Sequence, residues 1–267
     1  MERFDPKAQR FHLWIVDLTD DSFSPFTFGS ANEWTPVWSP DGTTIVYTGS
    51  RVHPNSYFVE DLYLKPSTGA RGEERLPSSQ GSNWAMDWSK DGKYIVYSDQ
   101  MTSHLWILPF WGDRKPALFT QTEFKQPPQA TFSPDGKWIA YASDETGSFE
   151  VFVSRFPASA GGKWQVSTAG GEQPQWRVDG KELFYISPDR KLMSVSVQTD
   201  DDIFRMGVPV SLFQTRLISN VASPSLWERN EYVVTANGQR FLMEAAAEEQ
   251  EPSTITVILN WQALLKH

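Results

Sequence analysis

Histidine, aspartate and glutamate are the side chains of this chain that could hold a metal ion, because the sequence contains no cysteine. The four histidines, at positions 12, 53, 104 and 267, form none of the closely spaced pairs that bind zinc on a helix. The acidic run 200–202 lacks the spacing of a calcium-binding EF-hand loop. We therefore expect no metal site and no cofactor.

Catalysis by a side-chain nucleophile finds no support either. The sequence contains no Gly-x-Ser-x-Gly elbow, which presents the nucleophile in α/β-hydrolases. A pair of carboxylates for glycosidase chemistry cannot be assigned from the sequence, because acidic residues that are far apart in the chain could come together in the fold. The sequence therefore predicts that the chain is not itself an enzyme.

Charge and composition restrict the partners. The net charge is −9 with only 24 Lys and Arg residues, which argues against binding to nucleic acid. No apolar run reaches the roughly 18 residues that would span a bilayer, so we expect no direct membrane insertion. Aromatic residues make up 14% of the chain, and 17 Gly and 18 Pro are scattered through it, which favours short strands joined by tight turns.

One ten-residue pattern recurs along the chain, and the elements that it predicts must position the residues of any site. Each strong copy has an aromatic residue, two further residues, Asp-Gly, and then a β-prone run that ends in tyrosine. The Asp or Asn residues of successive copies are 50, 44, 44 and 58 residues apart, and about 44 residues is the period of a propeller blade. The copies span residues 38–47, 88–97, 132–141, 176–185 and, more weakly, 234–243.

Each copy predicts a β-hairpin. Asp-Gly and Asn-Gly favour a type I′ turn, which needs positive φ at both central residues. A strand is expected on each side of every turn. The aromatic residues that open the four strong copies, Trp38, Trp88, Phe132 and Trp176, are expected to pack in the core between blades.

Two more strand-like runs follow each hairpin. Third strands are expected at 61–65, 105–108, 151–153 and 192–197, and fourth strands at 117–120 and 164–168. The predicted fold class is therefore all-β, a β-propeller of four-stranded antiparallel blades, with about six blades and a range of five to seven. A β-sandwich would not explain a repeat at this interval.

The N-terminal residues contain no such hairpin. His12–Leu18 has the pattern of a third strand and Pro25–Phe28 that of a fourth, so we expect the propeller to begin midway through a blade. Either the missing strands lie upstream in a longer protein, or C-terminal strands complete this blade and close the ring. Residues 1–267 are predicted to form a single propeller domain, which can be a fragment of a longer protein.

The repeated W-S-P-D-G sequence resembles that of TolB-type, WD-repeat-like propellers over nearly the whole chain. The run Ile255–Trp261 is also similar to the end of propellers fused to bacterial eukaryotic-like serine/threonine kinases and winged-helix regulators. The kinase motifs themselves are absent from this chain. The resemblance implies a bacterial signalling module that binds proteins. Its compartment is left open, and would be extracytoplasmic or periplasmic if an upstream membrane segment carried it.

Two tryptophans stand outside the repeated aromatic positions. Trp34 and Trp84 lie four residues before a repeat aromatic, in the loop that leads into the innermost strand. In propellers this loop and the loop between the second and third strands open on one face, and loops on a rigid scaffold carry function. Tryptophan is favoured at binding hot spots, although a place in the core is an equal alternative.

We expect binding residues in both sets of loops around the channel mouth. The loops before the innermost strands contribute Glu33, Trp34, Asn83, Trp84, Gln126, Glu172 and Gln173. The loops between the second and third strands contribute Arg51, His53, Gln100, Asp144 and Glu145.

The predicted function is that of a non-catalytic, monomeric propeller that binds a protein, a peptide or a small ligand as an interaction or sensor module. The negative net charge favours a neutral or basic partner. Two alternatives stay open. One is the gating propeller of a prolyl-oligopeptidase-like serine peptidase, and the other is a TolB-like scaffold of the cell envelope.

Overall fold

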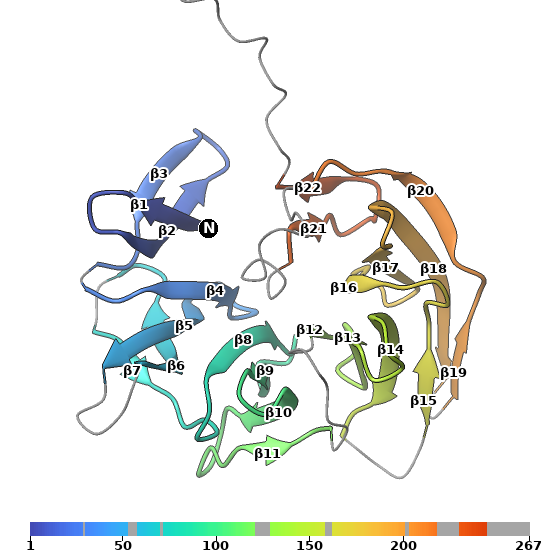
Figure 1. The fold of residues 1–267 in the computed structure, drawn as a ribbon, viewed down its shortest axis with the longest axis horizontal. Coiled ribbons are helices and arrows are strands. Elements are labelled where there is room, and N and C mark those ends of the chain that lie inside the picture. The colour runs from blue at the N-terminus through green and yellow to red at the C-terminus, as the bar shows by residue number, and fades with distance from the viewer. Residues whose placement is uncertain are drawn as a thin grey trace, which may run out of the picture.

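The fold is all-β, and its sheets are arranged around a common centre (Figure 1). The computed structural model describes residues 1–28, 30–52, 58–69, 72–120, 129–157, 162–200, 203–217 and 230–244. These residues form six sheets and contain no helix. In the same ranges no helix is long and apolar enough to cross a membrane. The predicted β-propeller class is confirmed.

Three of the sheets contain the predicted four antiparallel strands and a fourth contains five, and the strands run in chain order from the centre outward. Blade I consists of β4 (Glu33–Trp38), β5 (Thr44–Val52), β6 (Phe58–Pro66) and β7 (Glu74–Arg75). Blade II consists of β8 (Asn83–Trp88), β9 (Tyr94–Asp99), β10 (His104–Pro109) and β11 (Ala117–Leu118).

Blades III and IV follow the same order. Blade III consists of β12 (Gln129–Phe132), β13 (Trp138–Ser143), β14 (Glu150–Arg155) and β15 (Lys163–Gln165). Blade IV consists of β16 (Glu172–Trp176), β17 (Glu182–Ile186), β18 (Lys191–Asp200), β19 (Ile203–Met206) and β20 (Val210–Gln214). Its third strand, β18, is long enough to pair with β19 at one end and with β20 at the other.

Two smaller sheets complete the described fold. The N-terminal sheet consists of β1 (Glu2–Asp5), β2 (Arg10–Asp17) and β3 (Ser22–Pro25), and the C-terminal hairpin of β21 (Tyr232–Val234) and β22 (Phe241–Met243). Strand β2 confirms the predicted third strand, β3 ends where the fourth was expected to begin, and β1 was not expected. The run Ile255–Trp261 lies outside the described residues.

The five hairpins are confirmed, but the predicted type I′ turn is wrong. The glycines have φ between 68° and 74°, whereas none of the Asp or Asn residues before them has positive φ. In blade I the Gly42 N–H donates to the Ser39 carbonyl over 2.9 Å. Ser, Pro, Asp and Gly thus occupy the four positions of a type I turn, with only glycine in the left-handed region.

Side chains explain the rest of the repeated pattern. In blade II the Ser89 hydroxyl donates to Asp91 Oδ1 over 2.7 Å and accepts the Tyr94 N–H over 2.9 Å. Asp91 Oδ1 also accepts the Lys93 N–H over 3.1 Å. These bonds satisfy the polar groups at the turn, so the Ser-x-Asp-Gly sequence closes the hairpin by itself.

The core lies between neighbouring sheets. Trp88 packs with Val46 and Leu62 of the preceding blade, and Phe132 and Trp176 are buried in the same way. Trp38 contradicts the expectation of burial, since it is 49% exposed. An open pocket, lined by Leu13, Trp14 and Val16 of the N-terminal sheet, lies beside this indole, so the sheet does not close over it.

Candidate binding site at the channel mouth

One register position recurs on the innermost strand of every blade at the channel mouth. The residue at this position pairs with a partner in the same sheet. That partner is, in each case, the residue that directly follows the ten-residue repeat in the sequence. The side chains at this position change from blade to blade, unlike those of the hairpins. The five residues, which we call the mouth ring, are Trp34, Trp84, Gln129, Glu172 and Glu231.

The two tryptophans of the mouth ring stack on each other. Their ring centroids are 5.7 Å apart and their planes differ by 10°. The Trp84 Nε1–H donates to Glu60 Oε2 over 2.6 Å, and the Ser82 hydroxyl donates to the same oxygen. Both indoles are half-buried, so they are packed and still present part of their surface to solvent.

The acidic members of the ring come from neighbouring sheets. Glu231 is 3% exposed, and its Oε2 accepts a hydrogen bond from Gln173 Nε2 over 3.0 Å. Glu172 is half-buried, and its carboxylate receives no hydrogen bond or ion pair from the described residues. Burial, and then the charge of Glu231, raise the pKa of Glu172 above its usual value. A half-buried, unpaired carboxylate with a raised pKa is a common feature of functional sites.

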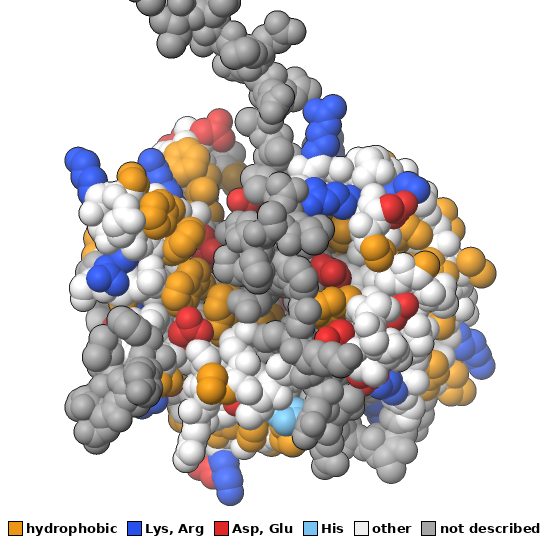
Figure 2. All heavy atoms as spheres, viewed as in Figure 1, with side chains coloured by type: hydrophobic (Ala, Val, Ile, Leu, Met, Phe, Trp, Pro, Cys, Tyr) orange, Lys and Arg blue, Asp and Glu red, His pale blue; other side chains and the backbone are white. Residues whose placement is uncertain are grey.

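A central cavity of about 460 Å³ extends between β1, β4, β8 and the C-terminal hairpin. Its wall contains Thr35 and Ala85, which directly follow the two ring tryptophans, and much of it is apolar. Three carboxylates, Glu2, Glu231 and Glu244, line it, and the described lining includes no Lys, Arg or His. Acidic side chains are also visible around the centre of the face drawn in Figure 2.

Several polar residues of the innermost strands join one blade to the next. Asp87 Oδ2 accepts the Thr131 hydroxyl over 2.9 Å and the Phe132 N–H over 2.8 Å, which connects blades II and III. Loss of solvation raises the pKa of this half-buried carboxyl despite these bonds. Gln129 Oε1 accepts the Gln173 N–H over 2.7 Å and connects blades III and IV.

Gln173 belongs to these bridges and not to the open surface. It is 3% exposed, and its Oε1 accepts the Glu231 N–H over 2.8 Å. The Tyr232 hydroxyl donates to the Gln173 carbonyl over 2.9 Å. Both bonds attach the C-terminal hairpin to blade IV, so the Gln173 side chain is committed to the scaffold.

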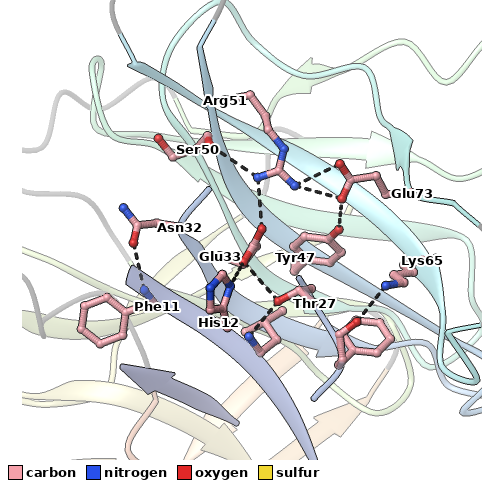
Figure 3. A network of polar contacts seen from close by, with 12 residues as sticks. Phe11, His12, Thr27, Asn32, Glu33, Tyr47, Ser50, Arg51, Lys65 and Glu73 are labelled. Carbon is pink, nitrogen blue, oxygen red and sulfur yellow. Dashed lines mark hydrogen bonds and ion pairs between the residues drawn. The ribbon is translucent and has the colours of Figure 1, made fainter. Parts of the chain in front are cut away.

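Glu33 and Arg51 form a second buried connection, between the N-terminal sheet and blade I (Figure 3). Glu33 is 1% exposed, and its Oε2 lies 2.8 Å from His12 Nδ1 and accepts the Thr27 hydroxyl. The Arg51 guanidinium donates to Glu33 Oε1 over 3.2 Å and to both oxygens of Glu73. Glu33 is therefore held inside the protein, and the half-buried Arg51 is engaged in this network.

The Tyr47 hydroxyl extends this network by donating to Glu73 Oε2. Burial, followed by the bond to Glu73, raises the pKa of Tyr47 far above its usual value. The Arg51 guanidinium also lies 4.6 Å from the ring centroid of Tyr63. Both terminal nitrogens of the guanidinium thus donate to neighbouring carboxylates.

The remaining predicted site residues differ in accessibility. Asn83 is fully buried, and its amide donates to the Gly81 carbonyl over 2.9 Å within its own loop. Asp144 is buried, and Glu145 contacts Lys163. Gln100 is half-buried and donates to Ser98 Oγ over 3.0 Å. His53 and Gln126 lie outside the described residues.

Three residues of the mouth were missed by the sequence analysis: Glu60, Gln129 and Glu231. Glu60 lies on a third strand, which carries no repeated signal at that position. The innermost strands of blades I, II and IV contain a β-bulge, whereas β12 and β21 pair without one. Each bulge adds one residue, so counting back from the hairpin misplaces the ring residue where the bulge is absent. No group of three or more potential metal ligands occurs in the described ranges.

Comparison with known proteins places the repeat in context. The family model of the TolB β-propeller domain matches residues 9–206. An uncharacterized protein of Agrobacterium fabrum is 28% identical over 131 residues, which cover 48% of this chain and 43% of that protein. The matched region therefore spans less than half the length of this relative.

Solved structures share the fold at low identity. TolB from Acinetobacter baumannii superposes with a TM-score of 0.57 at 20% identity, over 76% of this chain and 50% of that one. An oligogalacturonate lyase in complex with manganese gives a TM-score of 0.57 at 12% identity, over 87% of this chain and 67% of that one. A structure of the nidogen/laminin complex gives 0.54 at 12% identity, over 70% and 68%. Such identities show the common propeller fold alone.

Proposed function

The chain belongs to the TolB β-propeller domain family, and from this premise we propose that it is a recognition module whose mouth ring binds a basic side chain of a protein or peptide partner. The observation that carries the proposal is the stacked pair of Trp34 and Trp84 beside a cavity whose described lining has three carboxylates and no Lys, Arg or His side chain.

The chemistry of the ring selects a cation with an apolar stem. Indole faces attract a cation through the ring quadrupole, and tryptophan is the strongest of the aromatic residues in this respect. Glu172 supplies a carboxylate without a partner among the described residues, and the cavity adds Glu2, Glu231 and Glu244. A lysine or arginine side chain has an aliphatic stem that suits the apolar wall and a charged end that suits the carboxylates.

The scaffold suits this role because four of the five ring residues lie on innermost strands, and Glu231 directly precedes β21. Glu60 fixes the Trp84 indole, and the buried bridges around Asp87 and Gln173 hold the inner strands in register. A site whose side chains are already positioned loses less entropy when a partner binds. The same mouth would serve a sensor or an envelope scaffold, since the two roles differ in what the propeller is attached to.

Selection of binding peptides from a random library tests the proposal. We expect the enriched sequences to contain Lys or Arg, and we expect their affinity to fall with ionic strength because the ligand is charged. Trp34→Ala together with Trp84→Ala should weaken binding of such a peptide by roughly tenfold or more, the usual cost of removing a hot-spot tryptophan.

Trp111→Ala is the matched control, because Trp111 is 47% exposed and contacts Tyr94 away from the mouth. It should leave the peptide affinity unchanged. Enrichment of peptides without basic residues, or equal loss of affinity in the Trp111 variant, would refute the proposal.

A further inference from the structure

The C-terminal hairpin has an open edge in the described part of the chain. In blades I to IV the second strand pairs with an innermost strand on one side and with a third strand on the other. Strand β22 corresponds to a second strand, because it follows the Asn-Gly turn of the fifth repeat. Among the described strands it pairs with β21 only. The position of a third strand is therefore open beside β22.

Leu242 of β22 is exposed where the other blades bury the same repeat position. It is the ninth residue of its repeat and is 63% exposed. The corresponding side chains of blades I to IV are at most 1% exposed, and they are Val46, Val96, Ala140 and Phe184. In blades II and III a third-strand residue, Ile107 or Val153, pairs with this position and belongs to the same buried cluster. A third strand beside β22 would cover part of Leu242 in the same way.

The third strands share a short sequence signature. The third-strand residue that pairs with the one directly after the repeat is a fully buried Leu or Val in each blade, namely Leu62, Leu105, Val151 and Leu192. A large side chain follows it, and in three of the four blades Leu, Ile or Val comes next. Downstream of β22, the run Val257-Ile258-Leu259 repeats this order.

We propose that residues 255–261, which lie outside the described residues, bind the open edge of β22 as an antiparallel third strand of a fifth blade. The register of blades I to IV then places Val257 opposite Glu244 and Leu259 opposite Leu242. The residues that correspond to Glu244 and Val257 are 14, 7, 9 and 6 positions apart in blades I to IV. Glu244 and Val257 are 13 apart, so the connection has a length that the fold already uses.

The composition of the segment favours β22 over the other open edge. The sequence left open whether C-terminal strands complete the N-terminal sheet, whose edge strand β1 reads Glu-Arg-Phe-Asp. Strand β22 reads Phe-Leu-Met, and residues 255–261 contain no charged side chain. Apolar and β-branched pairs stabilise neighbouring strands, so this segment suits β22 better than the charged β1. The proposal does not depend on the ligand of the mouth ring.

Disulfide trapping tests the register, because the chain has no cysteine of its own. Under mild oxidation the variant Leu242→Cys/Leu259→Cys should form an intramolecular disulfide in most molecules, since directly opposite residues have Cβ atoms about 4.5–5.5 Å apart. Val233→Cys/Leu259→Cys is the matched control. Val233 is also exposed, but it pairs with Leu242 from β21 and would lie two strands, about 10 Å, from residue 259.

A third variant, Phe4→Cys/Leu259→Cys, tests β1 as the alternative partner, because Phe4 is an exposed residue of that strand. No disulfide in the first variant, equal yields in the first variant and the control, or a higher yield with position 4 would overturn the proposal.

Hydrogen exchange of the unmodified full chain gives a reading that no substitution can disturb. Backbone amides within residues 255–261 should exchange at least about tenfold more slowly than in a synthetic peptide of residues 245–267, because strand pairing protects them. Exchange at the rate of the free peptide throughout this segment would also overturn the proposal.

Discussion

The hairpin face and the mouth face of this propeller are built from the same strands but follow opposite rules. At the hairpins the same bonds recur: Ser or Thr to Asp or Asn, followed by glycine at positive φ. Blade IV keeps the geometry with a substitute, since Arg177 donates to Asp179 where the other blades use a hydroxyl. At the mouth, one register position holds two tryptophans, one glutamine and two glutamates.

This difference separates folding from recognition within one chain. A hairpin must close in every blade, so its chemistry is repeated wherever the fold needs it. The mouth ring has no such requirement, because a strand can present any side chain into the channel. Departures from the repeat are therefore the positions where we propose that function resides. Buried residues near the mouth must be set apart first, since Glu33, Asn83 and Gln173 also depart from the repeat and are structural. The same holds for two ring residues, Gln129 and Glu231, which are buried and bonded to Gln173.

The largest expected loss of stability comes from a substitution at one of these buried residues. Gln173→Ala removes the acceptor of the Glu231 N–H and a donor to the Glu231 carboxylate, both at the junction of blade IV and the C-terminal hairpin. Loss of partners for buried polar groups costs about 1–3 kcal/mol each, so we expect a destabilisation of about 3 kcal/mol in urea unfolding.

Gln100→Ala is the control for this variant, because Gln100 is a half-buried glutamine at the mouth with one bond from its amide, to Ser98. It should change the unfolding free energy by no more than about 0.5 kcal/mol. If Gln173→Ala lowers the unfolding free energy as little as Gln100→Ala does, the distinction between structural bridge residues and binding residues is wrong.

A smaller loss of stability is expected from substitutions on the hairpin face. Ser133→Ala removes the acceptor of the buried Trp138 N–H and the donor to Asp135 Oδ1, which should cost about 2 kcal/mol. Thr235→Ala removes the same two bonds in the C-terminal hairpin, where Thr235 is exposed and water can replace them. We expect that variant to lose under about 0.5 kcal/mol. Calorimetric unfolding compares the two, and neither should change affinity for a basic peptide.

Much of the fold could be predicted from the sequence because the hairpin chemistry is local. The five Asp-Gly or Asn-Gly copies and the third strands at 61–65 and 105–108 lie inside observed strands or turns. The turn type could not be predicted, since Asp-Gly suits both a type I′ turn and a type I turn followed by glycine at positive φ. Strand β1 carries only Glu-Arg-Phe-Asp, which has no alternation to reveal it.

The site was predicted less completely because it depends on register and burial. Trp34 and Trp84 were predicted from the sequence, and the structure brings them into contact. The buried Glu33 could not be distinguished from the half-buried Glu172, because both are glutamates at the start of an innermost strand. Burial there is set by His12 and Arg51, which come from other strands, and no local pattern encodes such contacts.

The smallest expected change in stability is a gain and not a loss, and it comes from a substitution at Glu172 of the mouth ring. A gain here would distinguish the mouth ring from the hairpins, where every substitution is expected to destabilise the protein. Burial and Glu231 raise the pKa of Glu172 in the folded protein, so its ionised form opposes folding at neutral pH, and this penalty disappears as the pH falls. Glu172→Gln should therefore stabilise the protein at pH 7, by less than about 1 kcal/mol, and lose that advantage in acid.

The same variant should weaken binding of a basic peptide, and the wild type should lose affinity as the pH falls through the raised pKa. Glu74→Gln, at an exposed pair with Arg114, should do neither. A gain in stability together with a loss of affinity would mean that Glu172 is kept charged for binding at the expense of folding. A loss of stability in Glu172→Gln would instead place this carboxylate among the structural bridges.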